Sequence, residues 1–304
     1  MKKTSKKIVF FGSGPVAAKA LELLAQDFLI EAVVTKPRPP HHRGNAPVVD
    51  LATKLGLPIL LASTKRELDL LFEDKPVNSN LGVLIDFGII VSQKIIDTFP
   101  LGIINSHFSI LPEWRGADPI TFAVLSGQKK TGVSLMLLVE KMDEGPLLDF
   151  AEYTLLDQVT TPGLTEALIE LSHHLLVKNI PAYLDGSLKP KPQTITKRAV
   201  SYSRKLTKND GILDFTKTAM QLDREIRAFV GWPQSRTQIA GKDVVITKAH
   251  SVPVDGKPGK IEALDKKSLI IYCGSGYLCI ERLKPAGKPE MDVVSFLAGY
   301  GKSL

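Results

Sequence analysis

Short apolar runs alternate with amphipathic segments throughout residues 1–186, and this alternation constrains the fold more than any other feature of the chain. A short apolar run bounded by turn residues is typical of a buried strand, whereas apolar positions three and four residues apart indicate a helix. We expect strands at residues 6–11, 28–35, 57–61, 81–85, 101–105 and 131–139, with helices at 16–25, 47–55, 65–73, 119–126 and 165–183. The succession is typical of βαβ units. It predicts a Rossmann-like, mostly parallel α/β sheet for residues 1–186.

Residues 209–304 follow a different pattern. One helix is expected at residues 216–229, followed by short strands separated by Gly and Pro, at 236–239, 244–249, 259–263, 269–273 and 277–283. Several short strands with turns between them are typical of a small barrel, so we expect an OB-like β-barrel domain. Cys273 and Cys279 are too few and too isolated for a disulfide framework or a zinc site, and we interpret them as buried thiols.

The segment between these regions, residues 187–208, is rich in proline and basic residues, and no acid lies between Asp185 and Asp210. We interpret it as a linker. Residues 1–186 carry 18 Lys and Arg against 21 Asp and Glu, whereas residues 187–304 carry 21 against 11, a net charge of +10. Such a charge difference favours a polyanionic partner for the second half. A basic surface that serves only solubility remains an alternative.

Two polar residues close the predicted strand at 101–105: Asn105 ends it and His107 follows two positions later. Alternation along an extended chain sends both side chains to one face. An amide donor and an imidazole at one point can hold a carbonyl oxygen and manage a proton. Asp143 follows the strand at 131–139, and in a parallel sheet its loop would open at the same edge. Its carboxylate could orient the imidazole or accept a proton; Glu144 is a weaker alternative.

Two other polar motifs are weaker signals of a functional site. Gly12-Ser-Gly14 follows the first strand, but the second strand ends in Val34-Thr35-Lys36, without the acid that a dinucleotide-binding fold places there. Nicotinamide binding is therefore rejected. The basic loop at residues 36–43 is expected to contact phosphate, with a solvated loop as the alternative; no metal role is expected for its two histidines.

The sequence Asn105-Ser-His107-Phe-Ser-Ile-Leu-Pro112 followed by Asp143-Glu-Gly145 resembles the active-site signature of the formyltetrahydrofolate-dependent transferases and hydrolases. The resemblance covers nearly the whole chain, and four further segments carry it: Trp114-Arg-Gly-Ala117, Tyr202-Ser-Arg-Lys-Leu-Thr-Lys208, Ile226-Arg-Ala-Phe-Val-Gly-Trp-Pro233 and Leu283-Lys-Pro-Ala-Gly-Lys288. These segments resemble the family members that formylate an aminoacylated initiator tRNA.

The resemblance implies roles for particular residues. Asn105, His107 and Asp143 would be catalytic. Ser109, Ile110, Leu111 and Pro112, together with Phe87, Gly88 and Ile89, would contact the folate. Arg38, Arg43, Lys205 and Lys208 would contact tRNA. Three departures from the family pattern are Phe108, where Gly or Pro is usual, Asp86, where a small residue is usual, and one extra residue in the turn at Gly12.

The implied reaction transfers the formyl group of 10-formyltetrahydrofolate to the free amino group of methionine carried on tRNA, with no metal and no covalent enzyme intermediate. Transfer to the amine of a UDP-linked sugar is the nearest alternative. Hydrolysis by water is another, but such hydrolases carry a domain ahead of the catalytic one, and a strand starting at residue 6 leaves it no room. A tRNA-binding protein with a decayed enzyme domain is disfavoured by the intact trio. We expect a cytoplasmic, monomeric protein with no membrane partner.

Overall fold

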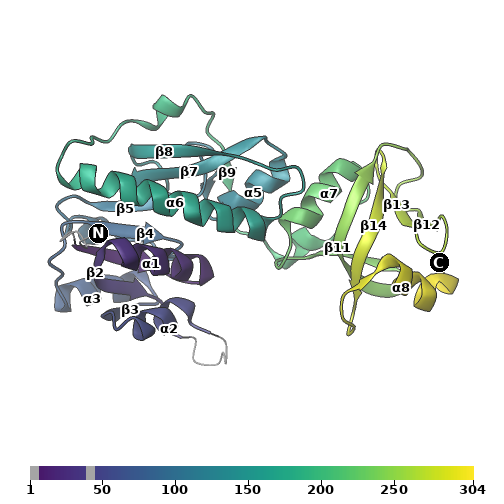
Figure 1. Cartoon of the computed structure of the whole chain (residues 1–304), viewed down its shortest axis with the longest axis horizontal. Helices are drawn as coiled ribbons and strands as arrows, with labels where there is room; N and C mark the ends of the chain where they lie inside the picture. The colour runs from purple at the N-terminus through teal and green to yellow at the C-terminus, as the bar shows by residue number, and fades with distance from the viewer. Residues whose placement is uncertain (1–6, 39–44) are drawn as a thin grey trace. The chain divides into compact units, whose positions relative to one another are not determined.

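A computed structural model describes residues 7–38 and 45–304 of the chain, which divides into two compact units. Unit 1 comprises residues up to Pro119, Lys130–Thr154 and Thr165–Tyr202, and unit 2 comprises Ile120–Lys129, Leu155–Leu164 and Ser203–Leu304. Figure 1 labels elements of both units. Among the described residues, no helix combines the length and the apolar character needed to cross a membrane.

The centre of unit 1 is a seven-stranded sheet of order β3-β2-β1-β4-β5-β7-β8. Its strands are β1 (Lys7–Gly12), β2 (Leu29–Thr35), β3 (Ile59–Leu61), β4 (Gly82–Ile85), β5 (Ile103–His107), β7 (Lys130–Leu137) and β8 (Leu147–Thr154). The pairs from β3 to β5 are parallel, whereas β7 is antiparallel to both β5 and β8. The predicted mostly parallel α/β sheet is confirmed, although β8 is an additional strand.

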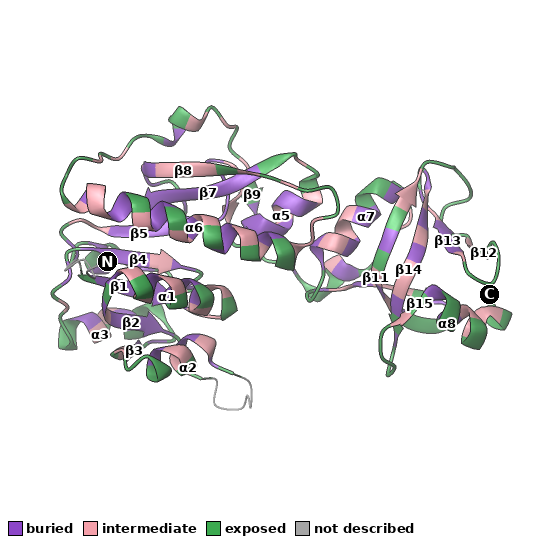
Figure 2. Cartoon of the chain, in the orientation of Figure 1, coloured by how far each residue is buried: buried purple, intermediate pink, exposed green. Residues whose placement is uncertain are grey.

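Helices cover both faces of this sheet (Figure 1). They are α1 (Pro15–Asp27), α2 (Pro47–Lys54), α3 (Lys65–Asp74), α4 (Gln93–Ile96) and the part of α6 (Thr161–Leu184) from Thr165 onward. The helix α5 (Pro119–Ser126) belongs to unit 2 except for its first residue. Burial on both faces explains why residues 8–11 of β1 are apolar at every position and fully buried (Figure 2). Phe11 packs against Phe72 of α3 and Phe99 after α4, with ring centroids 5.8 Å apart in both pairs.

Short elements complete unit 1. In the sequence, β6 (Arg115–Gly116) comes between β5 and α5, and a 3₁₀ turn, η1 (Gln193–Thr196), falls within the predicted linker. That part of the linker belongs to unit 1, because Leu147 and Lys191 exchange backbone hydrogen bonds of 2.7 Å. β9 (Tyr202–Ser203) lies where unit 1 gives way to unit 2.

Unit 2 contains an antiparallel sheet of order β10-β11-β14-β13-β12, with β15 paired to β14. Its elements are η2 (Lys208–Gly211), α7 (Ala219–Ala228), β10 (Ser235–Ile239), β11 (Lys242–Val252), β12 (Ile261–Ala263), β13 (Leu269–Tyr272), β14 (Tyr277–Pro285), β15 (Met291–Asp292), α8 (Val293–Tyr300) and η3 (Gly301–Ser303). The predicted β domain is confirmed as an antiparallel half-barrel.

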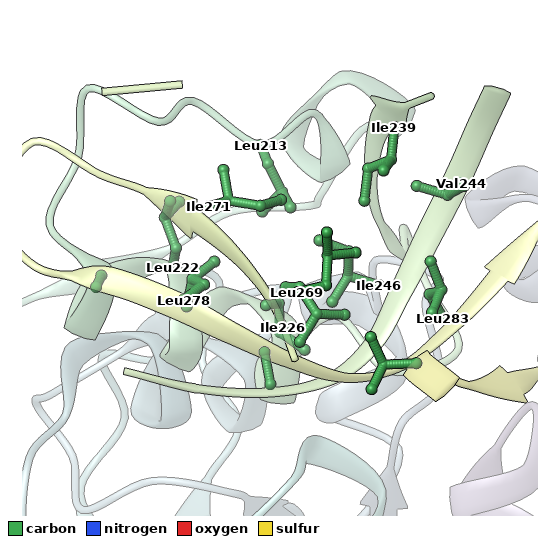
Figure 3. Close-up of a cluster of buried hydrophobic side chains, with 14 of the residues drawn as sticks. Leu213, Leu222, Ile226, Ile239, Val244, Ile246, Leu269, Ile271, Leu278 and Leu283 are labelled. Carbon is green, nitrogen blue, oxygen red and sulfur yellow. The ribbon is translucent and has the colours of Figure 1, made fainter. Parts of the chain in front are cut away.

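One face of this sheet closes over a hydrophobic core (Figure 3). Leu222 and Ile226 of α7 pack there against strand residues such as Val244, Ile246 and Leu283, all nearly or fully buried. Cys273 is buried and free, and burial raises the pKa of its thiol to about 11. The interpretation as a buried structural thiol is therefore supported for Cys273, but it was wrong for Cys279, which is only partly buried.

Candidate active site

Asn105 and His107 lie on one face of β5, while Ser106 between them faces the opposite side. The Ser106 hydroxyl lies 2.7 Å from the hydroxyl of Ser172 in α6, which fixes that side of the strand against the helix. Asn105 is 8% exposed and His107 is 6% exposed. The alternation of β5 therefore delivers an amide and an imidazole to the same largely desolvated position.

Asp143 reaches this position by a route that differs from the expectation. β7 runs antiparallel to β5, so its end lies beside the start of β5 and not at the edge where His107 lies. The expected strand direction was wrong. The loop at residues 138–146 instead turns back before β8 begins, and it brings the Asp143 carboxylate beside Asn105 and His107. The proximity thus comes from the path of the loop and not from strand direction.

The Asp143 carboxylate connects the three groups. Its Oδ1 accepts a long hydrogen bond of 3.5 Å from Nδ2 of Asn105 and lies 3.8 Å from Nδ1 of His107. Its Oδ2 accepts a hydrogen bond of 2.7 Å from the backbone N–H of Gly116 in β6. One carboxylate oxygen is therefore held by the backbone, and the other faces the two side chains.

The orientation of His107 is set by a backbone carbonyl. Its Nε2 lies 3.0 Å from the carbonyl oxygen of Trp114. Because a carbonyl can only accept, Nε2 carries a proton in this arrangement, and Nδ1 is the nitrogen that faces Asp143. Trp114 is itself fixed by a hydrogen bond of 2.9 Å from its N–H to the hydroxyl of Ser201.

Two non-glycine residues of the site adopt left-handed backbone conformations: Trp114 with φ 54° and Asp143 with φ 53°. Each such conformation costs of the order of 1–2 kcal/mol and persists only where surrounding contacts enforce it. Gln193 of η1 supplies those contacts at Asp143, since its Nε2 donates to the carbonyls of Asp143 at 2.7 Å and Gly145 at 2.9 Å.

Gln193 also accepts a hydrogen bond of 2.7 Å from Nη2 of Arg115, whose Nη1 lies 3.3 Å from the Glu144 carboxylate. The sequence interpretation missed Gln193, because a single Gln in a Pro-rich segment carries no local signal of a contact 50 positions away. Glu144, the weaker alternative to Asp143, is engaged by Arg115 instead.

The segment expected to contact folate, Ser109 to Pro112, is buried. Ser134 of β7 joins its backbone, since the Ser134 hydroxyl donates to the Ser109 carbonyl at 2.8 Å and accepts from the Leu111 N–H at 3.0 Å. The Leu111 carbonyl accepts from the hydroxyl of Thr196 at 2.8 Å. The segment forms a rigid wall after β5, and the neighbouring Phe108 is also buried, at 7% exposure.

The loop after β4 presents a mixed surface. The Phe87 ring is 2% exposed and packs into the core against Phe11, whereas Gly88 is exposed and Ile89 is partly buried. The Gly88 carbonyl accepts a hydrogen bond of 2.9 Å from Nζ of Lys36. Of the three residues expected at the folate pocket, Gly88 and Ile89 lie nearer the surface and Phe87 supports them from beneath.

Asp86 begins this loop with a left-handed backbone (φ 48°), and its carbonyl accepts from the Ser13 N–H at 2.9 Å. Desolvation raises the pKa of its carboxyl to about 6; the charge of Lys36 opposes this rise and that of Asp118 adds to it. Asp86 is nevertheless an exposed residue, so its carboxyl is crowded by neighbouring atoms and also in contact with solvent.

The residues expected to contact tRNA are exposed where they are described. Arg38 forms an ion pair of 2.7 Å with Asp50, and Lys205 and Lys208 are exposed in unit 2. Arg43 lies outside the described residues. Within residues 7–38 and 45–304, no group of three or more His, Cys, Asp or Glu side chains is arranged to hold a metal ion.

Two family models match the chain. The model for formyl transferase matches residues 6–180, and the model for the formyl transferase C-terminal domain matches residues 205–301. Among curated relatives, the methionyl-tRNA formyltransferase of Pseudoalteromonas translucida is 33% identical over 302 residues, which cover 96% of this chain and 94% of the relative.

Solved structures share the fold at lower identity. An N-formyltransferase from Helicobacter canadensis, in complex with folinic acid and dTDP-3-aminofucose, superposes with a TM-score of 0.69 at 19% identity, covering 90% of this chain and 98% of that one. HypX from Aquifex aeolicus in complex with tetrahydrofolic acid gives a TM-score of 0.66 at 15% identity, covering 98% of this chain and 48% of that one. Matches at this identity establish the fold, whereas the full-length relative and the two matched domains establish the family. The chain belongs to the methionyl-tRNA formyltransferase family.

Proposed function

We propose that the chain transfers the formyl group of 10-formyltetrahydrofolate to the amino group of methionyl initiator tRNA, with Asn105, His107 and Asp143 as its catalytic residues. The observation that carries this proposal is the position of Asp143, whose Oδ1 lies 3.5 Å from Asn105 Nδ2 and 3.8 Å from His107 Nδ1. An amide, an imidazole and a carboxylate meet there in a chain that matches both formyl transferase domains.

The reaction requires that charge on the formyl oxygen be stabilised. The neutral amine attacks the formyl carbon, a C–N bond forms, and the carbonyl oxygen becomes an oxyanion. The Asn105 amide donates a hydrogen bond to that oxygen, and a proton on His107 Nδ1 provides a second donor. Because both side chains are at most 8% exposed, little water competes for these bonds.

A proton must also leave the attacking nitrogen. Asp143 accepts it, directly or through a water molecule, and returns it to N10 of the folate as the C–N10 bond breaks. Tetrahydrofolate and N-formylmethionyl-tRNA are then the products, and no proton is gained or lost overall. The hydrogen bond from Gly116 fixes Asp143 Oδ2 and leaves Oδ1 to face the reacting groups.

The co-substrate assignment is supported by the tetrahydrofolic acid bound to HypX, which shares the fold. We place the pterin between the loop at Gly88 and Ile89 and the wall formed by Ser109 to Pro112. Because the wall side chains are buried and its backbone is hydrogen-bonded internally, it would shape the pocket more than it would donate to the ligand.

The acceptor is expected to be held through its phosphates by basic residues, among them Arg38, Arg43, Lys205 and Lys208. The net charge of +10 on residues 187–304 supports this placement for Lys205 and Lys208, whereas Arg38 and Arg43 rest on the family resemblance. A monomer acting in the cytoplasm suffices for this reaction, since the three catalytic residues come from one chain.

The decisive experiment supplies the purified protein with labelled 10-formyltetrahydrofolate and, separately, methionyl-tRNA or a UDP-linked amino sugar. We expect label on methionyl-tRNA and none on the sugar, with the rate lost in Asn105→Ala and His107→Ala variants that melt like the wild type. Label on the sugar alone would overturn the proposal, as would variants that transfer formyl at the wild-type rate.

A further inference from the structure

A pocket of about 710 Å³ lies on unit 2, lined by residues of β10, β11 and the end of β14. Strand register shows which face it occupies. Arg236 of β10 pairs with Val245 of β11, and Val245 pairs with Lys284 of β14, so these three side chains share one face. Val244 and Leu283, their immediate neighbours, belong to the core on the other face (Figure 3). The outer face therefore gives the pocket an apolar residue flanked by two cations, and the core residues Leu213 and Val244 also line it.

The guanidinium of Arg236 is held in place. Its Nη2 donates to the carbonyl of Lys208, the first residue of η2. Lys284 is exposed at the opposite side of Val245. The acid near Lys284 is Glu290, but that carboxylate is engaged by the guanidinium of Arg282, with distances of 2.8 Å and 3.1 Å.

A carboxylate and an amide occupy another part of the pocket. Nε2 of Gln238 donates to Oδ1 of Asp243 at 3.0 Å, and the two residues face each other across β10 and β11. Gln238 lies two positions after Arg236, and Asp243 lies two positions before Val245. They are therefore on the same face, roughly 7 Å along the strands from the cations.

The 3₁₀ turn η2 is fixed to the edge of this pocket. A Cβ on Gly211 would lie 2.1 Å from the carbonyl oxygen of Gln234, so only glycine permits this close approach. Thr207 and Asp210 form a capping box around the turn, and Arg204 pairs with Asp210. The basic segment that contains Lys205 and Lys208 therefore leads directly to the pocket.

We propose that this pocket holds one nucleotide of the tRNA strand, with its phosphates at Arg236 and Lys284 and its ribose hydroxyl at Asp243 and Gln238. The inference rests on the proposed function and specifies where unit 2 grips the RNA. Two cations suit the phosphodiester, whereas Asp243 repels phosphate but accepts a hydrogen bond from a 2′-hydroxyl, which DNA lacks. The volume exceeds that of an inorganic anion, and the adjoining basic turn favours a continuous strand over a free nucleotide.

The test measures the affinity of deacylated tRNA at several salt concentrations for the wild type, Arg236→Gln, Lys284→Gln and Asp243→Ala. Each cation variant is expected to lower the slope of log affinity against log salt by about one. It should weaken binding roughly fivefold to eightfold at 0.1 M salt, because one phosphate contact contributes a slope of about 0.7–0.9. Asp243→Ala, which removes the acceptor, is expected to reduce the preference for tRNA over a DNA strand of the same sequence.

Lys266→Gln is the matched control, since Lys266 is exposed between β12 and β13 and does not line the pocket. Arg236 supports η2, so its variant is interpreted only with an unchanged melting temperature; exposed Lys284 provides the test that does not depend on folding. Unchanged affinity and slope in Lys284→Gln, or a loss equal to that in Lys266→Gln, would overturn the inference.

Formylation of methionyl-tRNA by the wild type is assayed in parallel, because it tests the proposed function separately. Formylation by the wild type, together with normal tRNA binding by the pocket variants, would overturn the pocket proposal and leave the proposed function intact. Pocket-dependent tRNA binding without formylation would support the pocket and contradict the proposed function. A wild-type protein that binds no tRNA would contradict both.

Discussion

The side chain of Gln193 donates a hydrogen bond of 2.7 Å to the backbone carbonyl of Asp143, joining the segment before unit 2 to the loop that carries the carboxylate. The same amide donates to the Gly145 carbonyl at 2.9 Å. Asp143 is held in a left-handed conformation that it would not keep unaided. We therefore expect Gln193 to act as a positioning residue, which orients the proposed catalytic carboxylate of Asp143 without touching the reacting atoms.

Replacing Gln193 with Glu keeps the shape but turns the amide donor into an acceptor that faces two carbonyls. We expect kcat to fall at least about tenfold, because losing a hydrogen bond to a buried carbonyl costs roughly 1–3 kcal/mol and frees the Asp143 loop. Steady-state kinetics with both substrates measures the effect. Gln26→Glu, at an exposed position of α1, is the control. A Gln193→Glu enzyme with wild-type kcat would refute the positioning role.

Asp143→Asn tests the proposed proton acceptor itself. The new amide is isosteric and can still accept the Gly116 N–H through its oxygen, so the fold should be kept, but it cannot take a proton. We expect kcat to fall by about 10²–10⁴ with little change in the affinity for either substrate. Single-turnover formyl transfer, which isolates the chemical step, measures this. A decrease confined to KM would show that Asp143 only binds substrate.

Gly145→Ala tests the path of the loop. A Cβ at Gly145 would lie 1.7 Å from the carbonyl oxygen of Leu137, so the loop must move to accept it. We expect a loss of about 1–3 kcal/mol in the free energy of unfolding, together with a lower kcat, since Asp143 moves with the loop. Denaturant unfolding and kinetics on the same samples test both effects.

Gly299→Ala in α8 is the matched control for that substitution. Nothing lies within 4 Å of a Cβ built there, and alanine favours a helix over glycine by roughly 0.5–1 kcal/mol. The control should be neutral or slightly more stable with normal activity. Equal stability of the two variants would contradict the steric argument.

The sequence predicts those parts of the site that depend on local pattern. Alternation in β5 is enough to place Asn105 and His107 on one face, and apolar runs are enough to predict most of the parallel sheet. A strand pattern carries no direction, however, so the antiparallel course of β7 was not foreseen. The position of Asp143 depends on a close approach at Gly145 and on Gln193, which is 50 residues away, and no local propensity reports such contacts.

The half-barrel of unit 2 shows the same limit. Its strands were expected from short apolar runs between turns, but their pairing order, and with it the pocket face shared by Arg236, Val245 and Lys284, is set by long-range register. The helix α8 was not expected, although it carries a clear start signal: Asp292 accepts a hydrogen bond of 2.8 Å from the Ser295 N–H.

We expect Asp86 to make the stability of the chain depend on pH. Desolvation raises the pKa of its carboxyl from 3.8 to about 6 in the folded state; Lys36 opposes the rise and Asp118 adds to it. The folded state therefore binds this proton more tightly than the unfolded state. The stabilising contribution is complete below about pH 3.8 and is lost as pH rises through 6.

Asp86→Asn, which stays neutral, should gain melting temperature over the wild type between pH 4 and pH 7.5, by an amount reduced by solvent screening. A difference in melting temperature already present at pH 4 reflects only the effect of the substitution on the left-handed backbone. The exposed control Asp157→Asn should show no such pH-dependent gain. Parallel melting curves for Asp86→Asn and the wild type from pH 4 to 7.5 would show that this carboxyl is not desolvated.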